Sequence, residues 1–484
     1  MMAVRSLKIN WFYNTLLSVL KVLFPLVTAP YIARVLMPEG VGLFNFANSY
    51  VSYFVLFAAL GVPTYAIREI AKVREDASAL RKLTNELFSV TVFSTAAVTI
   101  PYLLSIALVP KLSANFVIFI VIGFVLYLSP FSVDWFYSGL EEFKYIALRS
   151  MLVKTICVIS LFLFVKTRED VLIYTIINVV NNVANNIWNY VRMSRSGFRP
   201  KIVTKGLKRH LRPSLILLSS SLAVSVYNLL DTLMLGFMKD YDQVAFYTSA
   251  ANISKMLVAL LTSLAVVTMP RVSAYLKDGA REEINRLAGN SFAFIILISV
   301  PAAVGLCCLA REFVPLFYGD SFVPATAPLC VMSFVMVAIA LSSLAGTQIL
   351  IAMGRDKEYL YSIVAGALLN FAANCVVIPW LGATGAALTS VLAEFVIFAV
   401  MMYFVRRHTF VRVDLSVPML KSVIGAALLV PLALLLRLLL DGWTFIFVYI
   451  LAGAVVYIVA ELALKHEAVP ALVSSLRGSL RKRH

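Results

Sequence analysis

Three lysines lie inside long apolar stretches, where little water is available to solvate an ammonium group: Lys21, Lys154 and Lys255. In the middle of a lipid bilayer each costs about 2.5–3.5 kcal/mol, even on a lenient insertion scale. A water-filled cavity that receives an anion would remove most of that cost. Lys21 and Lys255 therefore predict an anion-binding cavity, whereas Lys154 is close enough to the end of its stretch to reach the surface. The alternative for Lys255 is a pair with Asp231.

Amides and hydroxyls in the same stretches recur every three or four residues, which places them on single faces of helices. One face holds Asn10, Asn14, Ser18, Lys21, Pro25 and Thr28. Two others hold Ser221, Ser225, Asn228 and Asp231, and Thr248, Asn252, Lys255 and Thr262. Because polar groups in lipid need partners or water, three such faces predict one shared cavity.

The stretch 171–191 is dense in asparagine: Asn178, Asn181, Asn182, Asn185, Asn186 and Asn189. Two interpretations are equally open. The amides either form hydrogen bonds between helices, worth roughly 0.6–2 kcal/mol each, or contact the hydroxyl groups of a sugar. Weaker examples of the same pattern are Asn45, Asn48, Ser49, Ser52, Asn370, Asn374 and Glu394.

The amino-acid composition indicates that these apolar stretches lie in lipid and not in water. Of 484 residues, 61% are hydrophobic and only 14% are charged, with a mean hydropathy of +0.90. Apolar runs of the roughly 20 residues that a membrane helix needs recur along the whole chain, without the alternation of a membrane β-barrel. The sequence therefore predicts an all-α polytopic membrane protein with about 14 spans, near residues 10–36, 41–63, 83–109, 114–138, 146–165, 171–191, 213–237, 244–269, 288–310, 325–351, 358–379, 383–405, 420–440 and 443–464.

The formal net charge of +17 comes from basic residues that crowd every second loop. Under the positive-inside rule these loops are cytoplasmic, and so are both termini. The segment Ile67–Leu80 has the pattern of an amphipathic helix on the membrane surface. Since the charges are spread over membrane-edge loops and not over one aromatic-rich face, they do not indicate a nucleic-acid partner.

All five cysteines lie in apolar stretches: Cys157, Cys307, Cys308, Cys330 and Cys375. Their spacing does not suit a metal site, and their setting does not suit structural disulfides. We expect them to be small buried hydrophobic residues. The sequence indicates neither a metal nor a cofactor.

Several motifs resemble those of a known family. The N-terminal ones are Thr28-Ala-Pro-Tyr-Ile-Ala-Arg-Val-Leu36, Pro38-Glu-Gly-Val-Gly42, Ala58-Ala-Leu-Gly61 and Arg68-Glu-Ile70; the later ones are Asp231-Thr-Leu-Met-Leu-Gly236, Tyr247 to Lys255, Met269-Pro-Arg271 and Gly382-Ala-Thr-Gly-Ala-Ala387. Together they resemble the Wzx-type polysaccharide and O-antigen flippases of the multidrug/oligosaccharidyl-lipid/polysaccharide exporter superfamily, over about residues 8–405.

The resemblance implies two six-helix halves related by a pseudo-two-fold axis along the membrane normal, around a central cavity. Residues 41–49 and 244–252, six helices apart, resemble each other as such a repeat requires. We expect six-helix bundles at 1–195 and 213–409, a basic cytoplasmic linker at 196–212, two additional helices within 410–465 and a basic cytoplasmic tail at 466–484.

The resemblance also implies a function, which is alternating-access transport of an undecaprenyl-diphosphate-linked oligosaccharide across the bacterial inner membrane. Expected partners are this lipid, membrane lipids and other polysaccharide assembly proteins. The cavity candidates are Asn14, Lys21, Thr28, Arg34, Asn45, Asn48, Asn182, Asn185, Asn228, Asn252, Lys255 and Asn374. Asp231 and Glu394 are candidate proton or sodium sites, because no Walker-type run indicates ATP hydrolysis.

Three alternatives stay open. A MATE-like cation-coupled exporter of small molecules requires carboxylates to dominate the cavity, and the interior lysines are at least as numerous. A MurJ-like lipid II flippase shares the same superfamily. A membrane polysaccharide polymerase or ligase requires catalytic groups on a large external loop, whereas the outward loops are short. We therefore expect a transporter and not an enzyme.

Overall fold

A computed structural model describes residues 7–266, 275–276 and 279–466, without the side chains of residues 7–23, 219–228 and 259–266. In this described part every regular element is a helix. The expected all-α membrane architecture is confirmed. The predicted tail lies outside the described residues beyond His466.

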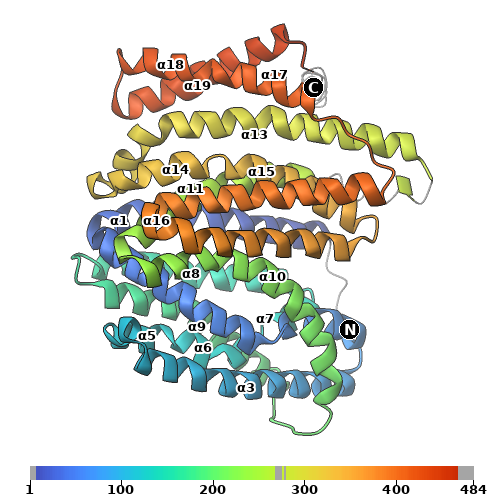
Figure 1. Ribbon diagram of the computed structural model, residues 1–484. Helices are drawn as coiled ribbons and strands as arrows, with labels where there is room; N and C mark the ends of the chain where they lie inside the picture. Colours follow the sequence, from blue (N-terminus) through green and yellow to red (C-terminus); the bar gives the residue numbers. More distant parts are fainter. Residues whose placement is uncertain (1–6, 267–274, 277–278, 467–484) are drawn as a thin grey trace. The chain divides into compact units, whose positions relative to one another are not determined.

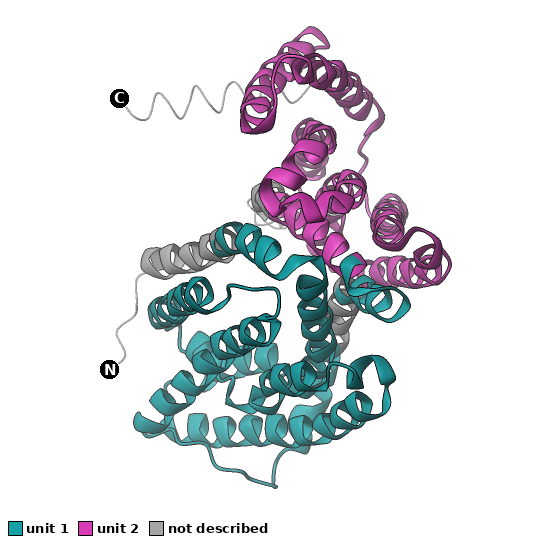
Figure 2. Cartoon of the chain, turned by 90° about the vertical axis from the view of Figure 1, so that its left-hand side faces the viewer, with its two compact units in different colours: residues 1–242 teal, residues 243–484 magenta. Residues whose placement is uncertain are grey.

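The chain forms two compact units, residues 1–242 and 243–484, coloured separately in Figure 2. The first unit contains α1 (Leu7–Ala59), α2 (Val62–Val73), α3 (Ala77–Leu108), α4 (Pro110–Ser113), α5 (Phe116–Ile122), α6 (Phe124–Tyr127), η1 (Ser129–Phe131), α7 (Asp134–Gly139), α8 (Phe143–Phe164), α9 (Val171–Arg195) and α10 (Lys208–Met238). The predicted bundle and linker boundaries stay predictions.

The second unit begins within α11 (Tyr241–Val266). It continues with α13 (Arg281–Tyr318), η2 (Asp320–Ala325), α14 (Thr326–Met332), α15 (Val335–Ser343), the π-helix η3 (Leu344–Ile351), α16 (Asp356–His408), α17 (Ser416–Ala427), α18 (Leu429–Arg437) and α19 (Gly442–Ala463). In Figure 1, α17, α18 and α19 run beside α13, against which all three pack.

Nine helical runs of the described residues are long and apolar enough to cross a bilayer. Two of them, Phe24–Val73 and Asp356–His408, are 50 and 53 residues long. A single crossing needs only about 20 residues. α16 therefore accommodates two predicted spans, one on either side of a break in the helix, and so does α1, whose 53 residues extend the first run back to Leu7.

The breaks fall at Met37 and Gly382, the two residues with non-helical backbone angles inside α1 and α16. Both have positive φ values, 59° and 53°. At Gly382 an added Cβ would collide with Oε1 of Gln243, which accepts a 2.8 Å hydrogen bond from the backbone N–H of Ala383. Glycine is required here by both the backbone angle and the close approach of Gln243.

The predicted surface helix Ile67–Leu80 is displaced. The structure has α2 at Val62–Val73, and a new helix, α3, begins at Ala77. Asp76 explains the break, because its carboxylate caps α3 by accepting hydrogen bonds from the N–H groups of Ser78 and Ala79. The amphipathic pattern of residues 67–80 continues past Asp76, although Asp76 caps the start of a new helix.

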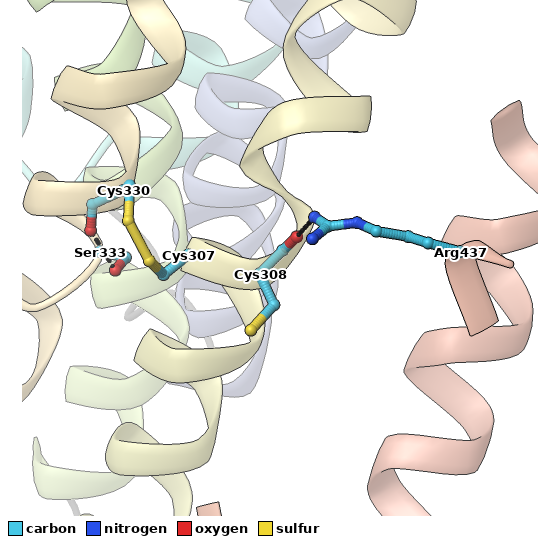
Figure 3. Close-up of a disulfide and its surroundings, with 5 residues drawn as sticks. All are labelled: Cys307, Cys308, Cys330, Ser333 and Arg437. Carbon is cyan, nitrogen blue, oxygen red and sulfur yellow. Dashed lines mark hydrogen bonds between the residues drawn. A yellow bond between two sulfur atoms is a disulfide. The ribbon is translucent and has the colours of Figure 1, made fainter. Parts of the chain in front are cut away.

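The prediction that the cysteines form no disulfide is wrong for one pair. Cys307 on α13 and Cys330 on α14 are disulfide-bonded, as Figure 3 shows. The bond joins two spans that lie side by side, so an apolar setting does not exclude it. Cys157, Cys308 and Cys375 are free, and of these only Cys157 is buried.

Candidate functional site

The cavity candidates of the first unit differ in exposure. Arg34, Asn48 and Asn182 are exposed, while Thr28, Asn45 and Asn185 are half-buried. Arg34 and Thr28 also bond to α1 itself, with Nη1 of Arg34 donating to the Pro30 carbonyl and the Thr28 hydroxyl to that of Phe24. Asn14, Lys21 and Asn228 lie outside the described side chains.

The amides of α9 are turned in a common way. The Nδ2 groups of Asn178, Asn182 and Asn185 donate to the carbonyl groups four residues earlier, at 2.6–3.0 Å. One N–H of each of these amides is thereby used within the helix, and the amide oxygen can accept from a group outside the helix. Such a row suits groups that donate hydrogen bonds, including hydroxyls and guanidinium groups.

One guanidinium does occupy this row, which the sequence analysis did not predict. Nε of Arg149, on α8, donates to Oδ1 of Asn185 at 2.9 Å. Its Nη2 forms an ion pair with Asp134 at 3.1 Å, and Asn189 also donates to that carboxylate. Asn185 and Asn189 thus support the structural interpretation of the asparagine run.

Arg149 is only 4% exposed, and its Nη1 has no hydrogen-bond partner among the described residues. The available signal was Asp134, an acidic residue inside the predicted span 114–138. A carboxylate inside a span needs a cation from a neighbouring helix to offset its charge.

Asp231, on α10, is 3% exposed and interacts electrostatically with Tyr53 of α1. The carboxylate is therefore inside the first unit and not at its surface. The ion-coupling role of Asp231 stays a prediction.

In the second unit, Asn252 and Lys255 are exposed on α11, one helical turn apart. The opposite side of the same helix is buried, with Ile253, Ser254 and Val258 all below 9% exposure. The predicted polar face of this helix is therefore its open face. An ammonium in a predicted span is stabilised by water or by a negatively charged group beside it.

Asn374 is fully buried, together with Asn370 one turn earlier on α16. Nδ2 of Asn374 donates to Oδ1 of Asn370 at 3.2 Å, and the Thr389 hydroxyl donates to Oδ1 of Asn374. The Thr389–Asn374 bond joins the two halves of α16 across the Gly382 break. In this conformation Asn374 has a helix-joining role, and its role in cargo binding stays a prediction.

Glu394 is also buried on α16, at 7% exposure, and interacts electrostatically with Tyr359. The ring of Tyr359 lies against Gly346 of the π-helix, where an added Cβ would come within 2.7 Å of it. Short π-helical segments often mark functional sites. Among the described residues no group of three or more metal-ligating side chains occurs.

The family model described as polysaccharide biosynthesis protein matches residues 7–276, more than half of the chain. A second model, MatE, matches residues 217–376. A curated protein of Escherichia coli (strain K12), "Putative O-antigen transporter", is 26% identical over 83% of this chain and 97% of its own length. Another, "Probable low-salt glycan biosynthesis flippase" of Haloferax volcanii, is 22% identical over 48% of each chain.

Two solved structures have a similar fold. A lipid II flippase, MurJ, in an inward closed conformation has a TM-score of 0.75 and 13% identity, covering 94% of this chain and 99% of its own. An inward-facing MATE family transporter has a TM-score of 0.59 and 13% identity, covering 80% and 94%. Both similarities concern the helical fold.

Proposed function

The chain belongs to the polysaccharide biosynthesis protein family, and from that premise we propose that it is a flippase for a lipid-linked oligosaccharide. The proposed cargo is an undecaprenyl-diphosphate-linked glycan that moves from the cytoplasmic to the periplasmic leaflet of the bacterial inner membrane. The observation that carries this proposal is the similarity to an O-antigen transporter over most of both chains. Both termini are proposed to be cytoplasmic.

Such a cargo needs a protein because its sugars cannot cross hydrocarbon unaided. Each hydroxyl that loses its water without a new partner costs about 4–8 kcal/mol. Even a short glycan therefore faces a barrier of tens of kcal/mol. A helix bundle with polar inner faces replaces the lost water, while the lipid tail stays in the bilayer.

The exposed polar face of α11 supports this arrangement. Lys255 and Asn252 supply a cation and an amide on one open helix face. An ammonium about 4 Å from one phosphate charge gains on the order of 4 kcal/mol at an effective dielectric of 20, before desolvation. We propose Lys255 and Lys21 as the groups that bind the diphosphate, and Asp231 and Glu394 as the coupling sites.

We propose two six-helix halves, residues 1–195 and 213–409, and a polar cavity for the cargo. Amides and hydroxyls suit the glycan because they can both donate to and accept from its hydroxyls. Other polysaccharide assembly proteins are proposed partners on either side of the membrane.

Reconstituted vesicles test this function directly. The purified protein should move a fluorescent lipid-linked oligosaccharide to the outer leaflet, and Lys21→Gln should abolish that movement without impairing insertion. Lys166→Gln is the matched control, because Lys166 is an exposed residue of the turn between α8 and α9. Wild-type transport by Lys21→Gln would remove Lys21 from the mechanism.

One observation favours a second candidate function. The MatE model matches residues 217–376, a segment that includes Asp231, and buried carboxylates are what an exporter of organic cations requires. The same vesicles distinguish the two, since an exporter would take up a cationic dye and leave the lipid-linked sugar in place.

A further inference from the structure

The linker between α9 and α10 runs beside α3 (Figure 1) and is hydrogen-bonded to it. The backbone N–H of Lys201 donates to Oδ1 of Asn85 at 2.9 Å, and that of Val203 to the Ser89 hydroxyl at 2.8 Å. These contacts lie within the first unit. They hold an exposed basic segment in a fixed position against one helix.

A basic pocket of about 310 Å³ lies where the linker meets the start of α10. Its polar lining consists of Lys82, Asn85 and Glu86 from α3, Lys205 and Gly206 from the linker, and Arg209 from α10. Gly206 keeps the pocket open, because its φ is +83° and an added Cβ would lie 2.6 Å from Oε1 of Glu86. Only glycine readily adopts this φ and also leaves the space next to Glu86 free.

The one carboxylate in this lining is already bonded. Arg209 forms an ion pair with Glu86, and Nε2 of His210 lies 2.9 Å from the same carboxylate oxygen. Nδ1 of His210 in turn lies 3.0 Å from the Tyr65 hydroxyl of α2. Lys82 and Lys205, both exposed, have no hydrogen bond or ion pair with any residue that the structure describes. The pocket therefore has a cationic surplus.

A second, mostly apolar pocket of about 940 Å³ continues along the same face of α3. Val92, Thr95, Ala96, Thr99 and Leu103 line it from α3, and Ile202 lines it from the linker. With Asn85 and Phe88 these α3 residues follow a spacing of three or four, which is one helix face. Ile202 and Val203, adjacent in the linker, line the apolar and the basic pocket respectively.

The two pockets together match an anionic lipid, because the basic pocket suits its phosphate and the apolar pocket suits an acyl chain. From Glu86 to Leu103 the helix rises about 25 Å, which exceeds the roughly 15 Å hydrocarbon depth of one leaflet. Ala96 and Leu103 are exposed, so the apolar pocket opens at the surface of the spanning helix. Ile202 is 59% exposed in an otherwise basic segment, as expected for a side chain that contacts a hydrocarbon chain.

We propose that this face of α3 binds an anionic phospholipid of the cytoplasmic leaflet. Its phosphate is bound by Lys82, Lys205 and Arg209, and one acyl chain lies along Val92 to Leu103. Basic segments next to spanning helices are attracted to anionic lipids in general. A phospholipid is favoured over the transported lipid because about 310 Å³ is at the small end of ligand sites and leaves little room for several sugar rings. This site does not depend on the proposed function.

Lipid retention by the purified full-length chain tests the proposal. Titration with phosphatidylglycerol, followed by thermal unfolding and by native mass spectrometry, should show saturable binding, and phosphatidylcholine should not. Lys82→Gln with Lys205→Gln should weaken binding by about fivefold per lysine, or about 25-fold together. The matched control is Lys201→Gln with Lys208→Gln, which removes two exposed charges from the same segment outside the pocket.

A separate variant tests whether the apolar pocket binds the acyl chain. Ala96→Phe fills the apolar pocket, so it should weaken the binding of long-chain phosphatidylglycerol but not of a short-chain form. Ala97→Phe lies outside the lining and should change the binding of neither lipid. Unchanged unfolding temperatures without lipid show that each variant folds. Equal binding by wild type and the Lys82/Lys205 variant would overturn the site. Saturation by a polyprenyl phosphate or by inorganic phosphate, without phosphatidylglycerol, would overturn the assignment to a membrane phospholipid.

Discussion

At the scale of single residues, charge inside the spans carries most of the functional argument. Lys255 is exposed on α11, whereas Asp231 and Glu394 are buried. A cation on an open face can meet an anionic cargo, whereas the two carboxylates are enclosed among the helices. The residue types thus suit different roles in the proposed cycle.

The two interpretations of Lys255 give opposite results in one double mutant. Lys255→Gln should abolish cargo binding if the ammonium binds the diphosphate, and adding Asp231→Asn should not restore it. Binding of a labelled lipid-linked oligosaccharide to the purified protein measures both variants, because binding does not need Asp231 as a coupling site. Recovery in the double variant would mean that the lysine served only to neutralise Asp231.

At the scale of helices, the last two spans are tied to α13 at both of its ends. The backbone N–H of Arg412, just before α17, donates to Oδ1 of Asn285 at 2.8 Å. At the other end Arg437 of α18 forms an ion pair with Glu312 at 2.8 Å and donates to the Cys308 carbonyl at 2.6 Å, which Figure 3 shows in part. These contacts fix the additional helices on the second unit.

Removing one partner of the Glu312–Arg437 pair should destabilise this attachment. Both side chains are partly buried, at 18% and 26% exposure, so the expected cost of Glu312→Gln lies between a surface and a buried pair, about 1–3 kcal/mol. Unfolding in detergent measures it. Glu283→Gln, in the exposed Glu283–Arg286 pair of the same helix, should cost less than about 0.5 kcal/mol. Equal losses from both variants would contradict the anchoring role of Arg437.

The sequence predicted the helices well because apolar length and spacing are local properties. It could not predict contacts that depend on how helices rotate against one another. Cys307 and Cys330 pair across two helices. The bonds of His210 join α10 to α2 and α3, more than 120 residues away. Asn374 illustrates the same limit, since an amide in a span can bond to cargo or, as here, to Thr389.

At the scale of the whole molecule, the distribution of charge determines the expected orientation. Basic residues of the 196–212 linker lie in the first unit, and two of them line the basic pocket. Anionic lipids are enriched in the cytoplasmic leaflet. The positive-inside rule and the inferred lipid site therefore both require the linker to be on the cytoplasmic side of the membrane.

Labelling of single cysteines tests that orientation. In a chain whose free cysteines Cys157, Cys308 and Cys375 are replaced by alanine, Thr167→Cys probes the α8–α9 turn and Ser196→Cys the linker, both at exposed positions. A membrane-impermeant maleimide on intact cells with a permeabilised outer membrane should label the first and reach the second only after lysis. Keeping Cys307 and Cys330 leaves the disulfide in place. The reverse labelling would place the linker outside, where the leaflet argument for an anionic phospholipid no longer holds.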